Sequence, residues 1–469
     1  MKTCICVIIK DEHQYLEEWV NHHLNLGIDE IFLFEDYSSK SHADIIKSFG
    51  DKVHLQSIDV IFHTEYMPKG CNVQEKLFDW FPNIYIKQFD WILFNDIDEF
   101  LILKQPLHEL LAEYDDKSAI WLKWRFYDAN GHIKKPQGKV IDNYTSYITT
   151  PFDYNWSHKS FLNCKKYTYW ENQIHKIKGG VFPINEFGDH QAWLNHYFTK
   201  SWEEWKEKLW LRGDVAPGNR KIHQFFKINS NMLHLKNDLM LEIAIDNATK
   251  LGFNQHINND KPTKYFHFCW FGGNEFSELH LKCIESWKEY LSDDYTVCLW
   301  NENSFDYNEC DFTKEAYKTH KWAFVVDYVR LWCVYNFGGV YFDTDVELLK
   351  PIDKLPNNFF AIEKETNLIS NGLGFGAEKW NEVIGKILNY QYNLNFTIEA
   401  MFDIISPKIV TNYFNNNGYE INLTKIHEFL GFTIYPDYYF CPMSYFTKEL
   451  DIKNETISIH HYDASWIDK

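Results

Sequence analysis

Residues 321–345 read KWAFVVDYVRLWCVYNFGGVYFDTD, and this stretch decides the fold predicted for the second half of the chain. Its apolar first part predicts a buried helix, which the Gly-Gly pair at 338–339 ends with a tight turn. A short strand follows and finishes at the Asp-Thr-Asp triplet, 343–345. A helix that leads through a glycine turn into a strand is typical of α/β proteins with a mostly parallel sheet. We therefore predict an α/β fold with this acidic triplet at the end of a strand.

A second acidic triplet, Asp-Ile-Asp at 96–98, ends another apolar run, WILFNDIDEFL. In an extended segment residues i and i+2 point to the same side, so each triplet directs its two carboxylates to one place. Two like charges so close are unfavourable without a cation, and Mg²⁺ or Mn²⁺ bridging to substrate phosphates is the natural occupant. A solvated turn is the alternative for a single triplet. The predicted metal ligands are Asp96, Asp98, Asp343 and Asp345.

The first half of the chain alternates strand and helix patterns from its start. Apolar runs predict strands at 4–9, 31–34 and 53–58. A helix follows the first strand, and residues 41–49 predict another. The buried stripe of the first helix is predicted to contain Leu16, Trp19, Val20, His23 and Leu24. Because the triplet at 96–98 closes a fourth strand, the pattern is that of a mostly parallel, Rossmann-like sheet.

The second half repeats this plan after a polar stretch, GFNQHINNDKP, whose composition is that of a linker. The predicted elements before its triplet are strands at 265–270 and 295–300 and a helix at 316–335. We therefore place a domain boundary near residue 255. The predicted arrangement is a domain at 1–250, a linker at 251–261 and a second domain at 262–469.

The composition limits the possible functions. The formal net charge of −19 argues against a nucleic-acid partner, because phosphate backbones require a basic face. A chain of 469 residues is too long for one core, and its hydrophobic content of 45% excludes a disordered protein. No apolar stretch reaches the roughly 18 residues that span a bilayer. Peripheral association with the inner face of a membrane remains open.

The ten cysteines form no CxxC pair and no zinc-type spacing with histidine, and several lie in apolar runs. They predict reduced core residues of a cytosolic protein. The start, MKTCICVIIK, is too short for a signal peptide and passes directly into charged residues, so it predicts the first strand. The expected location is the cytoplasm.

A charged stripe interrupts the apolar helix of the second half. Ala323, Asp327 and Arg330 fall at positions i, i+4 and i+7, on one side of the helix. An internal ion pair between Asp327 and Arg330 is one explanation. The functional explanation places Arg330 on a diphosphate and Asp327 on sugar hydroxyls.

With the glycine pair and the triplet, this stripe resembles glycosyltransferase family 32 and its relatives, which are retaining sugar transferases with a DxD motif. The resemblance covers about residues 262–469 and includes PTKYFHFCWFGG, LWNEN and SIHHYDASW. It implies a GT-A type fold and a histidine near the metal, for which we prefer His461 to His460 because Tyr462 follows it. The donor-binding residues that it implies are Trp270, Phe271, Ala323, Asp327, Arg330, Gly339, Tyr341 and Trp466.

The first half resembles glycosyltransferase family 92 and related family 2-like transferases over about residues 1–235. The phrases VIIKDEHQYLEEWVNHHLNLGIDEIFLFEDYSSKS, WILFNDIDEF, SHKSF and LNHYFTKSWEEW carry this resemblance. The chain departs from the family at Asp11, where Asn is common, and at Lys40, where Asp is frequent. The resemblance implies a donor pocket at the carboxyl ends of parallel strands. Its implied site residues are Glu12, Asp36 and Lys159 for the donor and Asp96, Asp98 and His196 for a metal.

For Lys159 and His196, a surface lysine and a hydrogen-bonded core histidine are the alternatives. The resemblance also implies inversion at the anomeric carbon, which requires an Asp or Glu as base, and the sequence does not identify that base. Glu99, which faces away from the triplet on a strand, is expected to be structural.

These features predict a bifunctional glycosyltransferase with two GT-A type domains in tandem, each using one Mn²⁺ or Mg²⁺ ion. The expected donors are UDP- or GDP-sugars, and the acceptor is a growing glycan or glycolipid of a surface polysaccharide or lipo-oligosaccharide. The second domain is expected to retain the anomeric configuration and the first to invert it. The residues expected to carry the chemistry are Asp96, Asp98, Asp327, Arg330, Asp343 and Asp345.

Three alternatives stay open. In the first, only the C-terminal domain is an active transferase and the N-terminal domain is degenerate and binds acceptor. In the second, the chain is a Mg²⁺-dependent phosphatase with an aspartyl nucleophile, because FDTDV fits its Asp-x-Asp signature. In the third, it is a carbohydrate-binding protein, which would explain the eighteen tryptophans but not the paired carboxylates.

Overall fold

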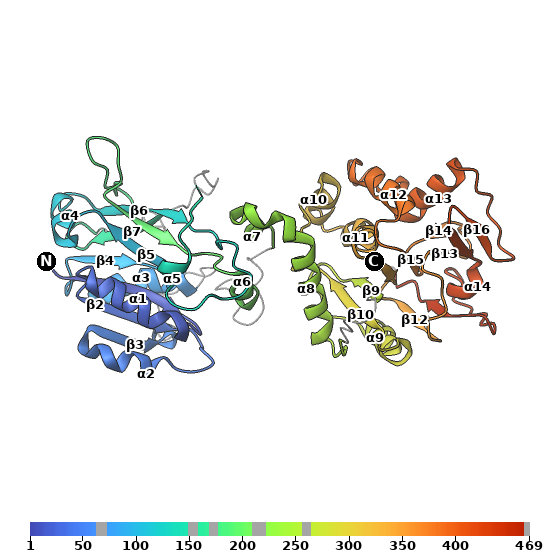
Figure 1. Ribbon diagram of the computed structural model, residues 1–469. Helices are drawn as coiled ribbons and strands as arrows, with labels where there is room; N and C mark the ends of the chain where they lie inside the picture. Colours follow the sequence, from blue (N-terminus) through green and yellow to red (C-terminus); the bar gives the residue numbers. More distant parts are fainter. Residues whose placement is uncertain (62–72, 149–157, 168–176, 209–221, 256–263, 464–469) are drawn as a thin grey trace. The chain divides into compact units, whose positions relative to one another are not determined.

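The alternating pattern of the sequence folds into two units, each built around its own eight-stranded sheet (Figure 1). The computed structural model describes residues 1–61, 73–148, 158–167, 177–208, 222–255 and 264–463. The first unit contains the described residues up to Leu233 except Ile222 and His223, which group with the second unit, and the second unit continues from His234. Among the described residues, no helix combines the length and the apolar composition needed to cross a bilayer.

The sheet of the first unit has the strand order β3-β2-β1-β4-β7-β6-β8-β5. Its first four members, which are parallel, are β1 (Thr3–Ile9), β2 (Glu30–Glu35), β3 (Val53–Ser57) and β4 (Trp91–Phe94). The other four, of mixed direction, are β5 (Glu99–Leu103), β6 (Ala119–Phe126), β7 (His158–Asn163) and β8 (Ala192–His196). The three strands predicted at 4–9, 31–34 and 53–58 are confirmed to within one residue at each end. The order 3-2-1-4 is that of a Rossmann-like sheet.

Helices of the first unit pack against strands of this sheet. They are α1 (His13–Asn25), α2 (Ala43–Ile46), α3 (Val73–Tyr85), α4 (Leu107–Glu113), α5 (Val140–Asn143), α6 (Trp202–Glu207) and α7 (Ile222–Ile228). Short 3-10 helices are η1 (Lys47–Lys52), η2 (Ile58–Ile61) and η4 (Ser230–Leu235). The helix predicted at 41–49 therefore consists of the single turn α2 followed by η1, with Gly50 outside helical geometry.

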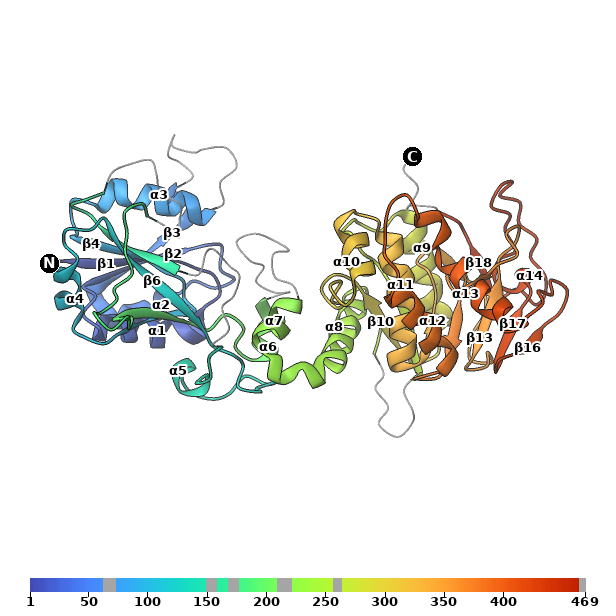
Figure 2. The same ribbon diagram turned by 90° about the horizontal axis from the view of Figure 1, so that it is seen from above.

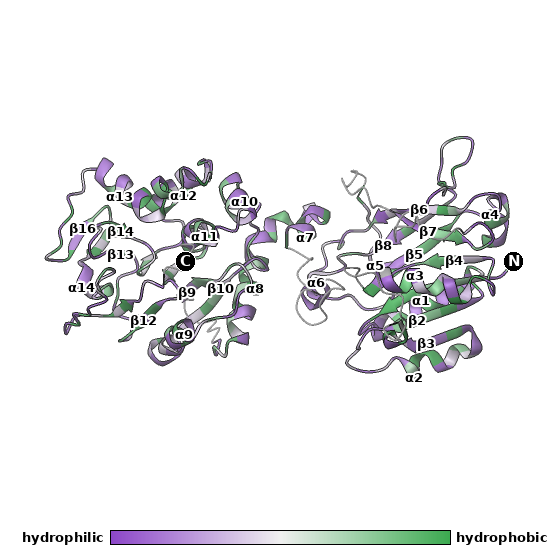
Figure 3. Cartoon of the chain, turned by 180° about the vertical axis from the view of Figure 1, so that it is seen from behind, coloured by the Kyte–Doolittle hydropathy of each residue, from purple (hydrophilic) through white to green (hydrophobic). Residues whose placement is uncertain are grey.

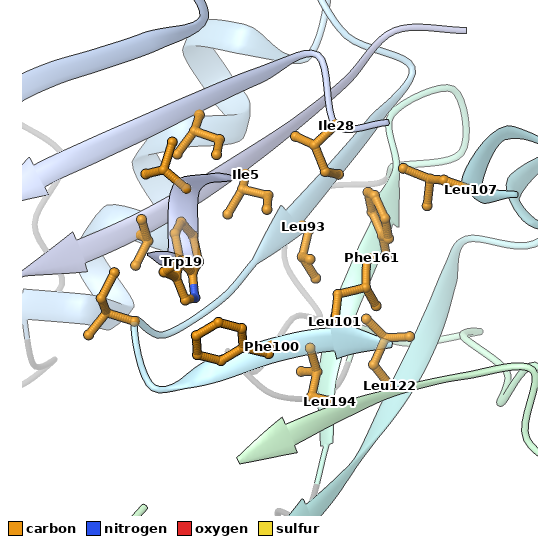
Figure 4. Close-up of a cluster of buried hydrophobic side chains, with 14 of the residues drawn as sticks. Ile5, Trp19, Ile28, Leu93, Phe100, Leu101, Leu107, Leu122, Phe161 and Leu194 are labelled. Atoms are coloured by element: carbon orange, nitrogen blue, oxygen red, sulfur yellow. The ribbon is translucent and has the colours of Figure 1, made fainter. Parts of the chain in front are cut away.

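A hydrophobic core joins α1 to the sheet. Figure 4 shows Trp19 from α1 beside Phe100 of β5, with Ile5 of β1 and Leu93 of β4 close by. The predicted stripe of α1 is confirmed, because four of its five members are buried and Leu24 is partly buried. The strands of this sheet are hydrophobic along much of their length (Figure 3), as expected of strands covered on both faces.

The sheet of the second unit has the strand order β10-β9-β11-β15-β13-β17-β16, with β14 paired to β13 at one side. Its strands are β9 (Lys264–Cys269), β10 (Tyr295–Trp300), β11 (Gly339–Tyr341), β13 (Phe359–Ile362), β14 (Ile369–Ser370), β15 (Phe375–Ala377), β16 (His427–Phe429) and β17 (Phe432–Tyr435). A separate two-stranded ladder joins β12 (Val346–Leu348) to β18 (Ser458–His460). The strand at 295–300 is as predicted. The strand β9 begins and ends one residue earlier than the strand predicted at 265–270.

The helices of the second unit lie on both faces of its sheet (Figures 1 and 2). They are α8 (Lys236–Lys250), α9 (Glu278–Tyr290), α10 (Asp311–Lys318), α11 (Trp322–Phe337), α12 (Glu382–Tyr392), α13 (Ser406–Asn416) and α14 (Asp437–Phe440), with the 3-10 helix η5 (Met401–Asp403). The helix α11 packs on β9, β11 and β15, and α10, α12 and α13 surround it. On β9, Phe266 and Phe268 contact Trp287 of α9, which covers the opposite face.

The helix predicted at 316–335 is two helices, α10 and α11. His320, between them, adopts a positive φ of 58°, which a continuous right-handed helix cannot contain. The second helix ends as predicted at the glycine pair. At Gly339 the φ is 98°, and a Cβ there would lie 2.3 Å from the Tyr265 carbonyl oxygen, so a side chain cannot be accommodated.

The helix α8 packs against β10 and belongs to the second unit. It belongs there because the apolar side chains of its buried face, which include Met240 and Ile243, are fully removed from solvent. The two units therefore separate before α8, whereas the composition of the sequence places the domain boundary near residue 255.

Candidate functional site

Both acidic triplets lie in a turn of the same form, between a strand that ends and a strand that begins. In the first unit, between β4 and β5, the Glu99 amide donates to the Asp96 carbonyl over 3.1 Å. In the second unit, between β11 and β12, the Val346 amide donates to the Asp343 carbonyl over 3.0 Å. Each triplet therefore follows a strand, as predicted, but is itself a turn and not the extended segment assumed from the sequence.

A tryptophan from a helix holds the residue that follows each triplet. Trp19 of α1 donates its indole N–H to the Glu99 carbonyl over 2.8 Å, and Trp287 of α9 donates to the Val346 carbonyl over 2.8 Å. Both rings are fully buried. Because each carbonyl directly follows its triplet, the two helices fix the two turns at the same point.

A histidine from the neighbouring strand faces the second aspartate of each triplet. In the first unit, β8 pairs with β5 and places His196 Nε2 3.5 Å from Asp98 Oδ1. In the second, β18 pairs with β12 and places His460 Nε2 3.3 Å from Asp345 Oδ1. The two units therefore contain equivalent arrangements of two aspartates, a tryptophan and a histidine.

From the sequence we prefer His461, but the structure places His460 beside Asp345. Successive residues along a strand face opposite sides, so only one of the two adjacent histidines can meet Asp345. The structure turns the other one away, with His461 Nε2 2.8 Å from Glu347 Oε2.

Arg330 lies between two carboxylates in the second unit. Its Nη2 is 3.1 Å from Asp327 Oδ1 and 3.2 Å from Asp343 Oδ1. The Tyr341 hydroxyl donates to Asp343 Oδ1 over 2.7 Å. The internal ion pair considered for the helix stripe is thus present, and the same guanidinium also reaches the triplet. The predicted residues Asp327, Arg330, Tyr341 and Asp343 come together.

The pKa values of the two aspartates of the second triplet are shifted in opposite directions. Burial raises the pKa of Asp343, and the Arg330 guanidinium offsets only part of that rise. Burial also acts to raise the pKa of Asp345, but the His460 charge outweighs it and the pKa lies below its usual value. Burial acts to lower the pKa of His460, but Asp345 outweighs it, so this pKa lies above its usual value. Burial raises the pKa of Asp327 to about 6, against the opposing effect of Arg330.

Lysines occupy the corresponding positions in the first unit. Lys159 of β7 is fully buried, with its Nζ 2.7 Å from Asp96 Oδ2 and 3.9 Å from Glu99 Oε1. Lys208, directly after α6, places its Nζ 2.8 Å from Asp98 Oδ2. Lys159, which we expected to hold a phosphate or lie on the surface, is therefore a buried partner of the triplet.

The pKa values of Asp98, Glu99 and His196 are shifted from their usual values. Burial acts to raise the pKa of Asp98, but Lys208, then His196, outweigh it and the pKa lies well below its usual value. Burial raises the pKa of Glu99 well above the ordinary range despite Lys159. Burial outweighs the effect of Asp98 on His196, so the pKa of His196 lies below its usual value, whereas that of the equivalent His460 is raised.

The triad of the second unit fits a divalent cation. Asp343, Asp345 and His460 each offer one ligand atom, and these atoms lie within 4.8 Å of one another. Carboxylate oxygens and an imidazole nitrogen are ligands that Mg²⁺ and Mn²⁺ accept. Gly372 leaves room for the Asp343 carboxylate, because a Cβ at position 372 would lie 2.3 Å from Asp343 Oδ2. Within the described ranges, this is the one group of three His, Cys, Asp or Glu residues with such spacing.

The equivalent residues of the first unit do not fit a divalent cation. Asp96 and Asp98 each accept a hydrogen bond from a lysine ammonium, which takes a carboxylate lone pair and repels a second cation. Among the predicted ligands, His196 lies 3.5 Å from Asp98, but Asp96, Asp98 and His196 do not form a group with the ligand spacing found in the second unit. The expectation of one ion per domain stays a prediction for this unit.

The aromatic residues predicted to bind the nucleotide base have different environments. Phe271 is 5% exposed and packs edge-on to Phe305, so it is a core residue. Trp270 is partly exposed and stacks on Phe276, with ring centroids 4.6 Å apart. Ala323 lies partly buried in the first turn of α11. Trp466 lies outside the described residues.

Two acidic residues predicted for the first donor pocket lie at the carboxyl ends of β1 and β2. Glu12 is buried at the start of α1, where its amide donates to His42 Nε2 over 2.9 Å. Asp36 directly follows β2 and is partly exposed. Both are at the sheet edge where the sequence pattern predicts them.

Sequence reasoning missed Lys208 and Lys200. Lys200 is 1% exposed, and its Nζ lies 3.5 Å from the ring centroid of Tyr15. Burial, with help from Lys208, lowers the pKa of Lys200 to about 8. Lys200 lies in the phrase LNHYFTKSWEEW, and a lysine enclosed by aromatic residues is the signal that could have directed attention to it.

The chain consists of two α/β units, each with an acidic triplet after a strand, and both regions match sequence models of glycosyltransferases. Residues 1–225 match the sequence model of glycosyltransferase family 92, and residues 277–361 match that of a glycosyltransferase sugar-binding region containing a DXD motif. The two resemblances drawn from the sequence are confirmed, and so is the fold class of two GT-A type domains.

The curated relatives match the first half of the chain. A family 92 protein of Oryza sativa subsp. japonica is 24% identical over 214 residues, which is 44% of this chain and 35% of that protein. A family 92 protein of Ricinus communis is 25% identical over 234 residues, 46% of this chain and 38% of that protein. The chain thus spans little more than a third of the length of these relatives.

Solved structures give distant matches. PaToxG glycosyltransferase is 16% identical, with a TM-score of 0.27 over 39% of this chain and 79% of that chain. Residues 1–349 of TarS from S. aureus are 18% identical, with a TM-score of 0.23 over 35% of this chain and 47% of that chain. At such TM-scores these matches say nothing about substrate or mechanism.

Proposed function

We propose that this chain is a glycosyltransferase that transfers sugars from nucleotide-sugar donors, with a divalent cation bound in its second unit. The observation that carries the proposal is the triad of Asp343, Asp345 and His460, which offers three ligand atoms in a DXD-type segment. A Mn²⁺ or Mg²⁺ ion bound there would neutralise the charge that develops on a departing nucleoside diphosphate.

The residues of this unit are arranged to keep the triplet in place. The Tyr341 hydroxyl and the Arg330 guanidinium both bind Asp343 Oδ1, so they restrict the carboxylate from one side. The Asp463 amide donates to Asp345 Oδ2 over 2.9 Å, and His460 approaches the other oxygen of the same carboxylate. Arg330 also supplies a positive charge beside the site for an anionic donor.

The donor is proposed to be a UDP- or GDP-sugar and the acceptor a growing glycan or glycolipid. The match of the first half to family 92 supports a second transferase unit and therefore a bifunctional enzyme, in which the second unit retains and the first inverts the anomeric configuration. The nine cysteines of the described ranges are all unpaired, which supports a reducing compartment such as the cytoplasm.

A second candidate is that only the second unit transfers sugar and the first binds acceptor. The lysines on Asp96 and Asp98 favour it, because a triplet that is already neutralised cannot serve as a metal site. Product analysis separates the two candidates. A bifunctional enzyme adds two sugars, and Asp345→Asn removes one addition while Asp98→Asn removes the other.

The proposal is tested with a panel of UDP- and GDP-sugars. The full chain is incubated with each donor and Mn²⁺, and release of the nucleoside diphosphate is followed with and without EDTA. We expect release from at least one donor, and its loss in EDTA. Release that continues undiminished in EDTA would contradict the metal-dependent site.

A further inference from the structure

The two triplets share one backbone frame but have different cations beside them. In the first unit both aspartates accept from lysine ammoniums, at 2.7 Å for Asp96 and 2.8 Å for Asp98. In the second unit, Asp345 has a histidine at 3.3 Å and a backbone amide at 2.9 Å. Imidazole can serve as a metal ligand, whereas an ammonium group cannot.

The lysines of the first unit are built into its core. Lys159 is 0% exposed, and β7 places it between Asp96 and Glu99. Its position is fixed by the strand, since β7 pairs with both β4 and β6. A charge that is this deeply buried persists only with partners, and the acidic side chains supply them.

Lys208 completes the neutralisation at the second aspartate. Its Nζ donates to Asp98 Oδ2 and also lies 3.3 Å from the Phe198 carbonyl oxygen. The side chains of Lys208 and Asp98 are 9% and 10% exposed, so solvent screens their interaction weakly. A third ammonium, on the buried Lys200, adds positive charge to this region.

We infer that the first unit holds no divalent cation, and that the ammonium groups of Lys159 and Lys208 provide the counter-charge that an ion provides in the second unit. The chain as a whole then binds one catalytic ion and not two. This inference rests on the proposed function only for the ion of the second unit.

The inference is tested by counting Mn²⁺ ions on the full chain. The protein is titrated with Mn²⁺ in the presence of UDP or GDP, and the free ion is measured by electron paramagnetic resonance. We expect one bound ion per chain. Two ions would overturn the inference, whereas none would refute the proposed site in the second unit and leave the first unit metal-free as inferred.

Matched variants at equivalent positions locate the bound ion. Asp345→Asn is expected to abolish Mn²⁺ binding, and Asp98→Asn to leave one ion per chain with an unchanged affinity. Loss of the ion in Asp98→Asn would overturn the inference, because it would place the ion in the first unit.

A gain of binding tests the role of the lysines directly. In Lys208→Gln, Asp98 loses its ammonium partner while His196 stays beside it, so we expect a second, weaker Mn²⁺ ion. Near-ultraviolet circular dichroism establishes that the variant is folded. A folded variant that still binds a single ion would show that Lys208 is not what excludes the metal; if the variant is unfolded, the count on the unmodified chain decides alone.

Discussion

The turn after β4 and the turn after β11 have equivalent backbone hydrogen bonds, each a supporting tryptophan and each a facing histidine, yet different charged side chains surround them. Lysines neutralise the first triplet, whereas the second has one guanidinium at its first aspartate and a histidine at its second. The comparison teaches that one DxD turn can be faced by two lysine ammonium groups and another by a guanidinium and an imidazole, of which only the imidazole can serve as a metal ligand. The motif alone does not decide which charged groups surround the turn.

The largest effect is expected when a carboxylate of the second triplet is removed. Asp345→Asn keeps the shape of the side chain but removes its charge, so we expect metal-dependent donor hydrolysis to fall by at least about 100-fold. Release of nucleoside diphosphate at saturating Mn²⁺ measures this. The control is Asp353→Asn, which changes an exposed aspartate that accepts a hydrogen bond from the Ser292 hydroxyl.

If Asp345→Asn lowered hydrolysis by less than about tenfold, the second turn would not differ in function from the first. The comparison between the turns would then fail.

The next effect concerns stability and the first turn. Lys159→Met leaves Asp96 and Glu99 without their buried cation, so we expect the first unit to lose about 3 kcal/mol of unfolding free energy. Hydrogen exchange of the β4 and β7 amides under urea measures this unit separately from the other.

The matched control is Lys165→Met, which removes an exposed lysine that pairs with Asp90 at 3.6 Å and Asp115 at 3.3 Å. A change below about 1 kcal/mol is expected there. Equal losses in the two variants would mean that the buried ion pair of Lys159 and Asp96 stabilises the unit no more than an exposed pair does.

A pair of tryptophan variants tests the shared frame. Trp19→Phe and Trp287→Phe each remove one indole N–H from the carbonyl after a triplet, so we expect each to cost its own unit about 1 to 2 kcal/mol. Trp380→Phe, at an exposed tryptophan, is the control and should change little. A large loss in one unit and none in the other would show that the two helices do not hold the turns in equivalent ways.

The smallest effect is a pH dependence in the first unit. The unfolded chain keeps Lys200 protonated until about pH 10, whereas burial lowers its pKa in the folded protein to about 8. Between these values the unfolded state binds more protons, so stability rises with pH, by about 1 kcal/mol from pH 8 to pH 9. Lys200→Met should remove this rise in urea unfolding at each pH. An identical pH profile in the variant would contradict the assignment.

Local patterns predicted much of the fold. The apolar runs located β1, β2, β3, β9 and β10, because buried strands of parallel sheets are continuous in hydrophobicity. The break between α10 and α11 escaped prediction, because it depends on the positive φ of His320 and the residue type gives little sign of it.

The candidate sites show the limit of sequence reasoning more clearly. Asp343, Asp345 and Arg330 could be found because their spacing along one segment brings them together. His460 could not be separated from His461, because the choice depends on the register of β18 against β12. Lys159 was visible as a residue, but its role depends on the long-range pairing of β7 with β4.

The closing strands β8 and β18 have a consequence for how the chain is made. In each unit the aspartates of the turn are synthesised well before the histidine that faces them, which arrives on the last strand of that unit's described part. A nascent chain on the ribosome therefore carries each acidic pair for a time without this partner. A chain truncated before residue 458 keeps every strand of the two eight-stranded sheets but lacks the imidazole of the proposed metal site.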